Sequence, residues 1–363
     1  MLKRVSIQNF KSLKNVTLDL QKVNLLIGPN NSGKTNFLKA LEYFGKNYNS
    51  FPRTEDKALT FNRNGLPVHY HLIDDSENAV HIEKGFDFGS GDIIDFSIYN
   101  SENRNTGNGI VVDIPGEKEL KRLIVSANIY KPDPNKLTQP GPVGMGEETI
   151  NSDVSNLVGF LDIMLSKYRR TVFTQIEIDL HHCISEFDEI KLDDAPYVAE
   201  EQKRKFKENS FKRLGLGSST KNISFWADEL SEGTLYFLAL LSIVNQPNPP
   251  KLLLLEEPEK GIHPRRIREV MDFIFRLAEE KDVQIILTTH NEHVLDDFAT
   301  RPEAVFVFDK DEEGTTYVKN LQREIIEPIN EYNKSLGLGC IDLTSNLSEN
   351  WLYGLLGGVP SIP

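Results

Sequence analysis

A glycine-rich segment early in the chain, Gly28-Pro-Asn-Asn-Ser-Gly-Lys-Thr35, has the residue types and spacing of a phosphate-binding loop. Its glycines allow backbone amides and the start of a following helix to face phosphate oxygens. We expect Lys34 to reach the β- and γ-phosphates of a nucleoside triphosphate and the Thr35 hydroxyl to bind Mg²⁺. The alternative is a strand-to-helix turn without a ligand. The candidate phosphate-binding residues are Gly28, Asn30, Asn31, Ser32, Gly33, Lys34 and Thr35.

Two adjacent carboxylates follow a second apolar run, Leu252 to Leu255. Ligands of open α/β sheets bind at the carboxyl ends of the strands, where Glu256 and Glu257 would lie. We expect Glu256 to hold the shell of the Mg²⁺ ion, through water, and Glu257 to polarise the water that attacks the γ-phosphate. Without the phosphate-binding loop, a solvated acidic strand end would explain the pair equally well.

Three further segments carry candidate residues whose ordinary explanation is structural. Ser231, in LSEGT, opens a strongly apolar helix and is a good N-cap. His290 ends the next apolar run, IILTTH, where a histidine is commonly structural. Lys11 and Ser12 lie between the first two predicted strands, where a surface turn would suffice.

Together, GPNNSGKT, LSEGT, LLLLEEPEKGIHP and TTH resemble the AAA and ABC-type ATPases of the OLD, RecF and SMC-like branch. The resemblance is to small bacterial members without a TOPRIM domain, some of which act in anti-phage systems. It implies that Ser231 and Gly233 bind the γ-phosphate held by the opposite protomer, and that His290 senses this phosphate. Glu232 and Thr234 depart from the usual LSGGQ form of the signature motif, although an LSxGT-like variant is usual in the small SMC-like ATPases.

The same resemblance implies further contacts with the nucleotide and between protomers. Lys11 and Ser12 would lie along the nucleotide. His263 falls in the D-loop, a dimer-contact segment, although packing at the start of a helix is an equal alternative. The Q-loop glutamine of the family has no clear counterpart.

The predicted elements form an α/β fold with an antiparallel β meander and a short helical arm insertion, and the resemblance implies that it is a P-loop NTPase, specifically an ABC-type ATPase head. Alternating and continuous apolar runs predict strands in residues 1–27, and residues 60–130 predict an antiparallel meander that includes LIVSANIY. From Trp226 onward, helices alternate with buried strands, which is typical of a parallel sheet. We expect one lobe of the head at residues 1–130, a linker and helical arm at 131–225, and the second lobe at 226–363.

Composition narrows the class of protein. The 363 residues carry a formal net charge of −13, so a DNA contact would need a local basic patch. The stretch from Lys203 to Arg213 is the candidate, with a solvated helix face as the commoner explanation. Two distant cysteines, Cys183 and Cys340, exclude a disulfide framework and a zinc ribbon. We find no targeting signal and no run long enough to cross a membrane, and expect a cytoplasmic protein.

The function expected from these residues and the resemblance is an ATP-hydrolysing switch that uses ATP and Mg²⁺. It would form a homodimer, or a higher even oligomer, head to tail around the nucleotides, and control DNA or a separate effector such as a nuclease or toxin, in anti-phage defence or DNA repair. The alternative is a nucleotide-gated binding or scaffold protein with negligible turnover. A small-molecule kinase is disfavoured, because such kinases act without a signature motif or a switch histidine.

Overall fold

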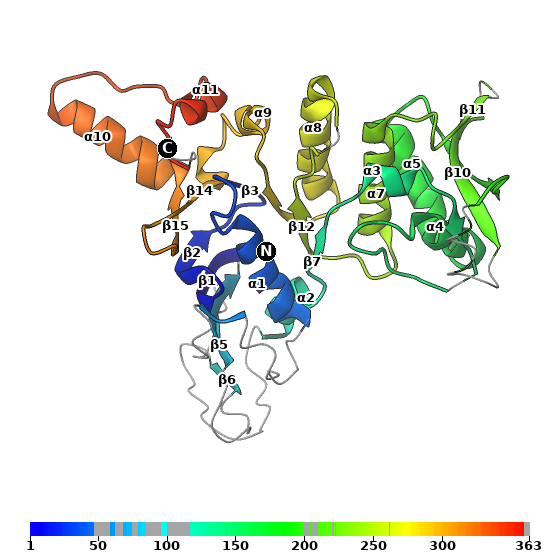
Figure 1. Ribbon diagram of the computed structural model, residues 1–363, viewed down its shortest axis with the longest axis horizontal. Helices are drawn as coiled ribbons and strands as arrows, with labels where there is room; N and C mark the ends of the chain where they lie inside the picture. Colours follow the sequence, from blue (N-terminus) through cyan, green and yellow to red (C-terminus); the bar gives the residue numbers. More distant parts are fainter. Residues whose placement is uncertain are drawn as a thin grey trace. The chain divides into compact units, whose positions relative to one another are not determined.

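The computed structural model describes most of the chain, in two compact units (Figure 1). The first unit comprises Met1–Ile129, Lys251–Glu257 and Asp282–Pro363, and the second Tyr130–Pro250 and Pro258–Lys281. The lobe boundaries expected from the sequence, at residues 130 and 225, stay a prediction. The described residues are 1–46, 59–61, 68–74, 79–84, 96–99, 117–144, 146–198, 200, 204, 210–219, 221, 223–260 and 262–358.

A six-stranded sheet, in the order β15-β14-β3-β13-β12-β7, organises the first unit. The four strands at its centre pair in parallel and are almost wholly buried, as continuous apolar runs predict. They are β3 (Val23–Ile27), β12 (Leu252–Glu256), β13 (Gln284–Thr288) and β14 (Val305–Lys310). The prediction of a parallel sheet is therefore confirmed.

The edges of this sheet differ from its centre. A short strand, β7 (Asn128–Tyr130), neighbours β12. At the other edge, β15 (Thr316–Asn320) pairs antiparallel with β14 after a turn in which Gly314 has φ 80°. The sequence analysis identified no strand at β15.

A second sheet of the first unit is antiparallel throughout, in the order β2-β1-β4-β5-β6. Its strands are β1 (Leu2–Phe10), β2 (Leu13–Asp19), β4 (Val68–Asp74), β5 (Ala79–Lys84) and β6 (Phe96–Tyr99). The last three confirm the expected meander. The run GIVVDI at residues 109–114 lies outside the described residues.

The prediction of a strand over LIVSANIY is wrong for its first part. Residues Glu117–Ile124 form a helix, α2, and only β7 is extended. Leu120 and Ile124 are both buried and lie four residues apart, which is the spacing of one helix face. Leu120 belongs to the charged segment that precedes LIVSANIY. The helical spacing is therefore visible only when that segment is included in the pattern.

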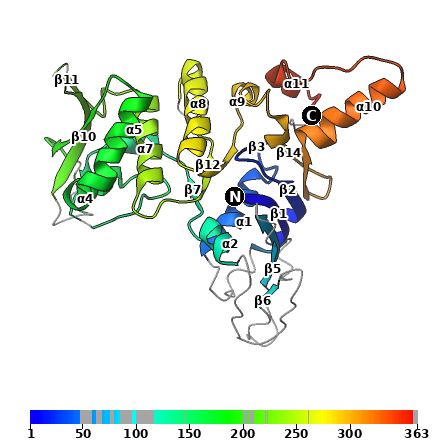
Figure 2. The same ribbon diagram turned by 180° about the vertical axis from the view of Figure 1, so that it is seen from behind.

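Helix α1 (Lys34–Lys46) links the two sheets through its apolar face. Phe37, Leu41 and Phe44 are buried in a cluster with residues from both sheets. The rings of Phe44 and Tyr70 lie 4.6 Å apart, and those of Phe37 and Phe308 lie 6.0 Å apart. Figure 2, the view from behind, shows α2 beside α1. This packing fixes the start of α1 at the end of β3.

The remaining helices of the first unit follow the later strands. They are α9 (Glu292–Asp296), the 3-10 turn η4 (Pro302–Ala304), the π-helix η5 (Leu321–Ile326), α10 (Glu327–Ser335) and α11 (Leu347–Leu352). Within the described part of the chain, no helix is long and apolar enough to span a bilayer.

The second unit combines helices with a small antiparallel sheet. Its helices are α3 (Pro134–Leu137), α4 (Leu157–Lys167), the π-helix η3 (Arg169–Phe173), α5 (Thr174–Cys183), α7 (Glu232–Asn245) and α8 (Pro264–Glu280). Strand β10 (Phe211–Ser218) pairs with three others, β8 (Gly141–Pro142), β9 (Glu189–Asp194) and β11 (Ile223–Trp226). The expected helices of the insertion are present, whereas this sheet was missed because its strands are short, charged or glycine-rich.

Candidate nucleotide-binding site

The loop after β3 has a backbone that only glycine accepts at two positions. Gly28 has φ 140° and Gly33 has φ 110°. A Cβ atom on Gly28 would lie 2.2 Å from the Phe308 carbonyl oxygen, and one on Gly33 would lie 2.3 Å from Thr316 Oγ1. The two glycines therefore serve both the turn and the close packing of the loop on its neighbours. Between them, Asn31 adopts φ 66°.

Lys34 is a buried cation held by this loop. Its Nζ donates hydrogen bonds to the carbonyl oxygens of Gly28 at 2.7 Å and Pro29 at 3.0 Å, and lies 3.4 Å from Ser32 Oγ. Burial lowers the pKa of Lys34 to about 8, while the charge of Glu257 acts in the opposite direction. Because water no longer solvates this ammonium fully, an anion bound in the loop would stabilise its charged form.

The two residues expected to hold Mg²⁺ lie in contact. Thr35 Oγ1 donates a hydrogen bond of 2.8 Å to Glu256 Oε1, although the residues are 221 positions apart. Thr35 is in the first turn of α1, and Glu256 ends β12. A hydroxyl and a carboxylate are hard oxygen donors, the kind that Mg²⁺ binds together with phosphate oxygens and water. The donor set therefore fits a magnesium ion.

Glu257 and His290 meet beside this pair, each just beyond the end of a central strand. His290 Nε2 lies 3.7 Å from Glu257 Oε1. Glu257 has φ 50°, which is a strained conformation for a residue other than glycine, and its amide donates to the Thr288 carbonyl at 3.0 Å. Strain of this kind concentrates at functional sites. Here the strained backbone directs the carboxylate of Glu257 differently from that of Glu256.

Ser12 also reaches the loop, through a residue that the sequence analysis missed. Thr316 Oγ1, on β15, lies 2.9 Å from the Ser32 carbonyl oxygen, to which it can only donate, and 2.8 Å from Ser12 Oγ. Asn36 Nδ2 donates to Ser12 Oγ at 2.9 Å. The signal for β15 was available, because a glycine turn separates VFVFDK from TTYVKN and so predicts a hairpin.

Lys11 and the loop's two asparagines differ in surroundings from these residues. Within the described chain, no hydrogen bond joins the Lys11 side chain to the loop; its Nζ lies 5.8 Å from the Phe10 ring centre. Burial lowers the pKa of Lys11, and the nearby charge of Lys39 adds to this effect. Asn30 and Asn31 are exposed at the tip of the loop.

The signature segment belongs to the second unit. Ser231 caps α7, and its Oγ accepts a hydrogen bond from the Thr234 amide at 3.2 Å, so the expected N-cap is confirmed. A Cβ atom on Gly233 would meet nothing closer than 3.9 Å. His263 caps α8 in the same way, accepting from the Arg265 amide at 3.3 Å, while its predicted dimer contact stays a prediction.

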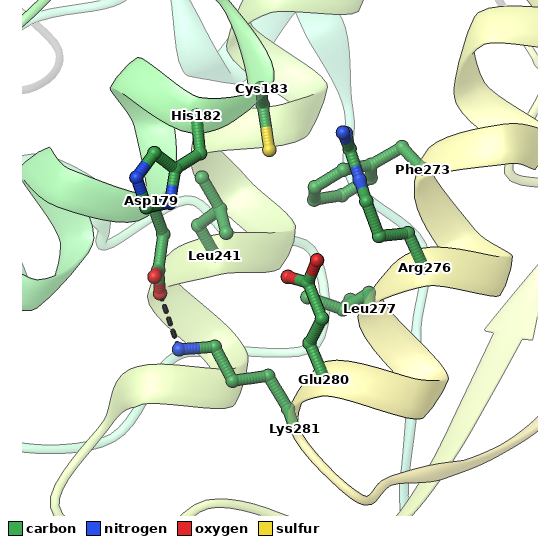
Figure 3. A pocket seen from close by; sticks show the side chains of 9 residues that line it. All are labelled: Asp179, His182, Cys183, Leu241, Phe273, Arg276, Leu277, Glu280 and Lys281. Carbon is green, nitrogen blue, oxygen red and sulfur yellow. Dashed lines mark ion pairs between the residues drawn. The ribbon is translucent and has the colours of Figure 1, made fainter.

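A small cavity lies between α5, α7 and α8 (Figure 3). Its volume is about 20 Å³, which suits no more than a water molecule. Asp179 and Lys281 form an ion pair of 2.5 Å across it, and the Asn245 side chain bonds to both. Burial raises the pKa of the Cys183 thiol to about 11, so it is a poor nucleophile. The ion pair and the hydrogen bonds of Asn245 hold α5, α7 and α8 together, and the residues around the cavity do not form a ligand site.

The basic stretch is only partly described, since residues 203 and 205–209 lie outside the described residues. Lys212 and Arg213 are on strand β10, which corrects the interpretation of the whole stretch as a helix face. Lys212 pairs with Asp162 at 2.6 Å. The guanidinium of Arg213 lies 3.6 Å from the centre of the Trp226 ring. These two charges are already engaged within the protein, and DNA binding by the rest of the stretch stays a prediction.

The fold and the site define an ATPase of the P-loop class with an ABC-type head. A family model described as an AAA ATPase domain matches residues 1–224. The chain therefore belongs to the AAA ATPase domain family. A second model, described as "AAA domain, putative AbiEii toxin, Type IV TA system", matches residues 160–296.

Curated relatives and solved structures agree with this class. The energy-coupling factor transporter ATP-binding protein EcfA2 of Bacillus thuringiensis (strain Al Hakam) is 27% identical over 205 residues, covering 55% of this chain and 64% of the relative. EcfA2 of Geobacillus kaustophilus (strain HTA426) is 28% identical over 188 residues, covering 50% and 59%. The matches thus span less than two thirds of these relatives. An Smc head bound to the C-terminal winged-helix domain of ScpA shares the fold, with a TM-score of 0.54 at 15% identity over 88% of this chain and 96% of that one.

Proposed function

We propose that the protein binds ATP with Mg²⁺ and hydrolyses it as a molecular switch. The observation that carries this proposal is the meeting of Thr35 with Glu256 at 2.8 Å, next to Glu257 and His290, which lie 3.7 Å from each other. Phosphate-binding, metal-binding and water-activating groups from distant parts of the sequence thereby share one edge of a sheet. The family and the ABC-type relatives support the same reaction.

Each residue has a distinct role in the proposed hydrolysis. Lys34 binds the β- and γ-phosphates through its ammonium group, and the loop amides bind the remaining oxygens. Glu257 accepts the proton of the attacking water as general base, and His290 donates a hydrogen bond to the γ-phosphate. Thr35 and Glu256 would hold Mg²⁺, which neutralises charge on the phosphates when bound.

The second part of the proposal is a head-to-tail homodimer in which Ser231 and Gly233 complete the partner's site. Helix α7 begins at these residues, and the N-terminus of a helix attracts phosphate. Closure of the dimer would report the bound nucleotide to DNA or to an effector subunit such as a nuclease or toxin. The match to a toxin-system model supports a setting in anti-phage defence, and the need for ATP and Mg²⁺ supports the cytoplasm.

The decisive experiment compares Glu257→Gln with the wild type and with Lys34→Ala. We expect Glu257→Gln to bind ATP but to lose about 10²–10⁴ of kcat, because the water loses its base while the phosphate contacts remain. ATP should then trap the variant as a dimer, measured by light scattering. Lys34→Ala should not bind ATP.

Turnover near the wild-type rate in Glu257→Gln would contradict the proposed base. A wild-type protein that binds ATP and dimerises, but turns over no faster than Glu257→Gln, would instead support the nucleotide-gated scaffold.

A further inference from the structure

Arg266 lies against the signature segment, although no motif includes it. It is in the first turn of α8, and its Nη1 donates a hydrogen bond of 3.0 Å to Ser231 Oγ. Its Cδ is the atom nearest to the position that a Cβ on Gly233 would take, at 3.9 Å. The stem of the arginine therefore follows the turn, and its charged end reaches the cap of α7.

The guanidinium of Arg266 keeps most of its donors for another partner. The side chain is exposed, and a guanidinium carries five N–H donors, of which Ser231 uses one. Among the described residues, no carboxylate lies within ion-pair distance of it. A guanidinium matches the paired oxygens of a phosphate, so its free donors suit that ligand.

Arg266 also determines which way the Ser231 hydroxyl bonds. Ser231 Oγ accepts one hydrogen bond from the Thr234 amide and a second from Arg266, which occupies both lone pairs. The hydroxyl proton is then left to donate. Thr234 Oγ1, at 2.8 Å, is its nearest acceptor, and a phosphate oxygen could replace it. Arg266 thus sets Ser231 as a donor towards an anion.

We propose that Arg266 binds the γ-phosphate of the partner protomer's ATP, together with Ser231 and Gly233. This inference rests on the proposed head-to-tail function and adds a residue to its shared site.

The test begins with Arg266→Ala, with Arg268→Ala as the matched control, because Arg268 is an exposed arginine of the same helix. We expect Arg266→Ala to bind ATP as the wild-type monomer does and to lose about 10²-fold in kcat. Arg266→Lys should recover part of the loss, and Arg268→Ala should stay within about twofold of the wild type. Equal thermal unfolding midpoints exclude a folding defect.

Mixing variants tests whether Arg266 acts across the interface. Arg266→Ala mixed with Lys34→Ala should regain activity, since one site then combines an intact loop with an intact Arg266. Alone, Lys34→Ala should be inactive and Arg266→Ala should keep only about 1% of the wild-type kcat.

The outcomes separate this inference from the proposed function. If Ser231→Arg is inactive while Arg266→Ala matches Arg268→Ala, Arg266 has no role at the phosphate and only this inference is overturned. Normal hydrolysis by Ser231→Arg would overturn the head-to-tail model and Arg266 with it.

Discussion

The phosphate-binding loop and the signature segment are both built from a glycine and a helix start, yet their surroundings are opposite. In the first unit, Lys34 is buried under loop carbonyls, and Thr35 already bonds to Glu256. In the second unit, Glu232 and Arg266 are exposed. The loop is thus preformed within its own unit. The signature segment presents donors that its own unit leaves open, which is expected of a half-site that another surface completes.

The largest effect expected from this comparison is loss of turnover in variants of either region, with recovery on mixing. Ser231→Arg should bind ATP but lose about 10²–10³ in kcat, because the γ-phosphate loses its donors from the partner. Lys34→Ala should fail at binding instead. An ATPase assay on the mixture should show activity that neither variant has alone.

A mixture as inactive as its parents would contradict pairing across an interface. The matched control is Lys34→Ala mixed with Glu257→Gln. Each site of that heterodimer lacks either the loop lysine or the base, so we expect no recovery.

A smaller and more local effect is expected from alanine at the two glycines. Gly33→Ala places a Cβ 2.3 Å from Thr316 Oγ1 at φ 110°, so it should cost about 1–3 kcal/mol of the free energy of unfolding and weaken ATP binding. Gly233→Ala meets nothing closer than 3.9 Å and lies in a helix, where alanine is favoured by up to about 1 kcal/mol. Its effect should be confined to kcat.

Urea unfolding and nucleotide titration of both alanine variants check this contrast. Equal losses of stability at the two positions would remove the distinction between a preformed loop and an open half-site.

The smallest effect concerns an ion pair in each unit. Asp179 and Lys281 have side chains only 12% and 21% exposed, whereas Lys22 and Asp282 are 27% and 81% exposed. Lys281→Met should lower the free energy of unfolding by about 2 kcal/mol, because Asp179 and Asn245 then lose their charged partner between packed helices. Lys22→Met should change it by less than about 1 kcal/mol. Thermal unfolding measures the loss of stability in both variants. A larger loss in Lys22→Met than in Lys281→Met would show that the ion pair of Asp179 and Lys281 does not stabilise the second unit.

The sequence predicted those parts of the site whose residues lie close together in short, continuous segments. The loop from Gly28 to Thr35 and the strand ending at Glu256 each carry their own pattern of apolar, glycine and charged residues. Parallel strands bring their carboxyl ends to one edge of a sheet, so the meeting of Thr35 with Glu256 follows from those patterns. The central sheet was predictable for the same reason.

The missed parts depend on a partner that is distant in sequence or on a single side chain. Thr316 reaches the loop only because β15 folds back on β14, and nothing at position 316 marks it as a neighbour of Ser32. Arg266 is one of several arginines on α8, and only its contact with Ser231 distinguishes it. The sheet of the second unit escaped notice because β10 carries glycines and charges in place of an apolar alternation.

The Thr316 contact has a consequence for how the protein is made. The loop is synthesised well before Thr316, which supports the Ser32 carbonyl and lies 284 positions later in the chain. Both strands that flank β3, namely β13 and β14, also follow it at a long distance in the sequence. A nascent chain therefore carries an incomplete phosphate loop until Thr316 has been made, and the edges of β3 stay unpaired until β13 and β14 have been made. Completion of the loop has to wait for these later segments, and chaperones would meet β3 as an exposed apolar strand until then.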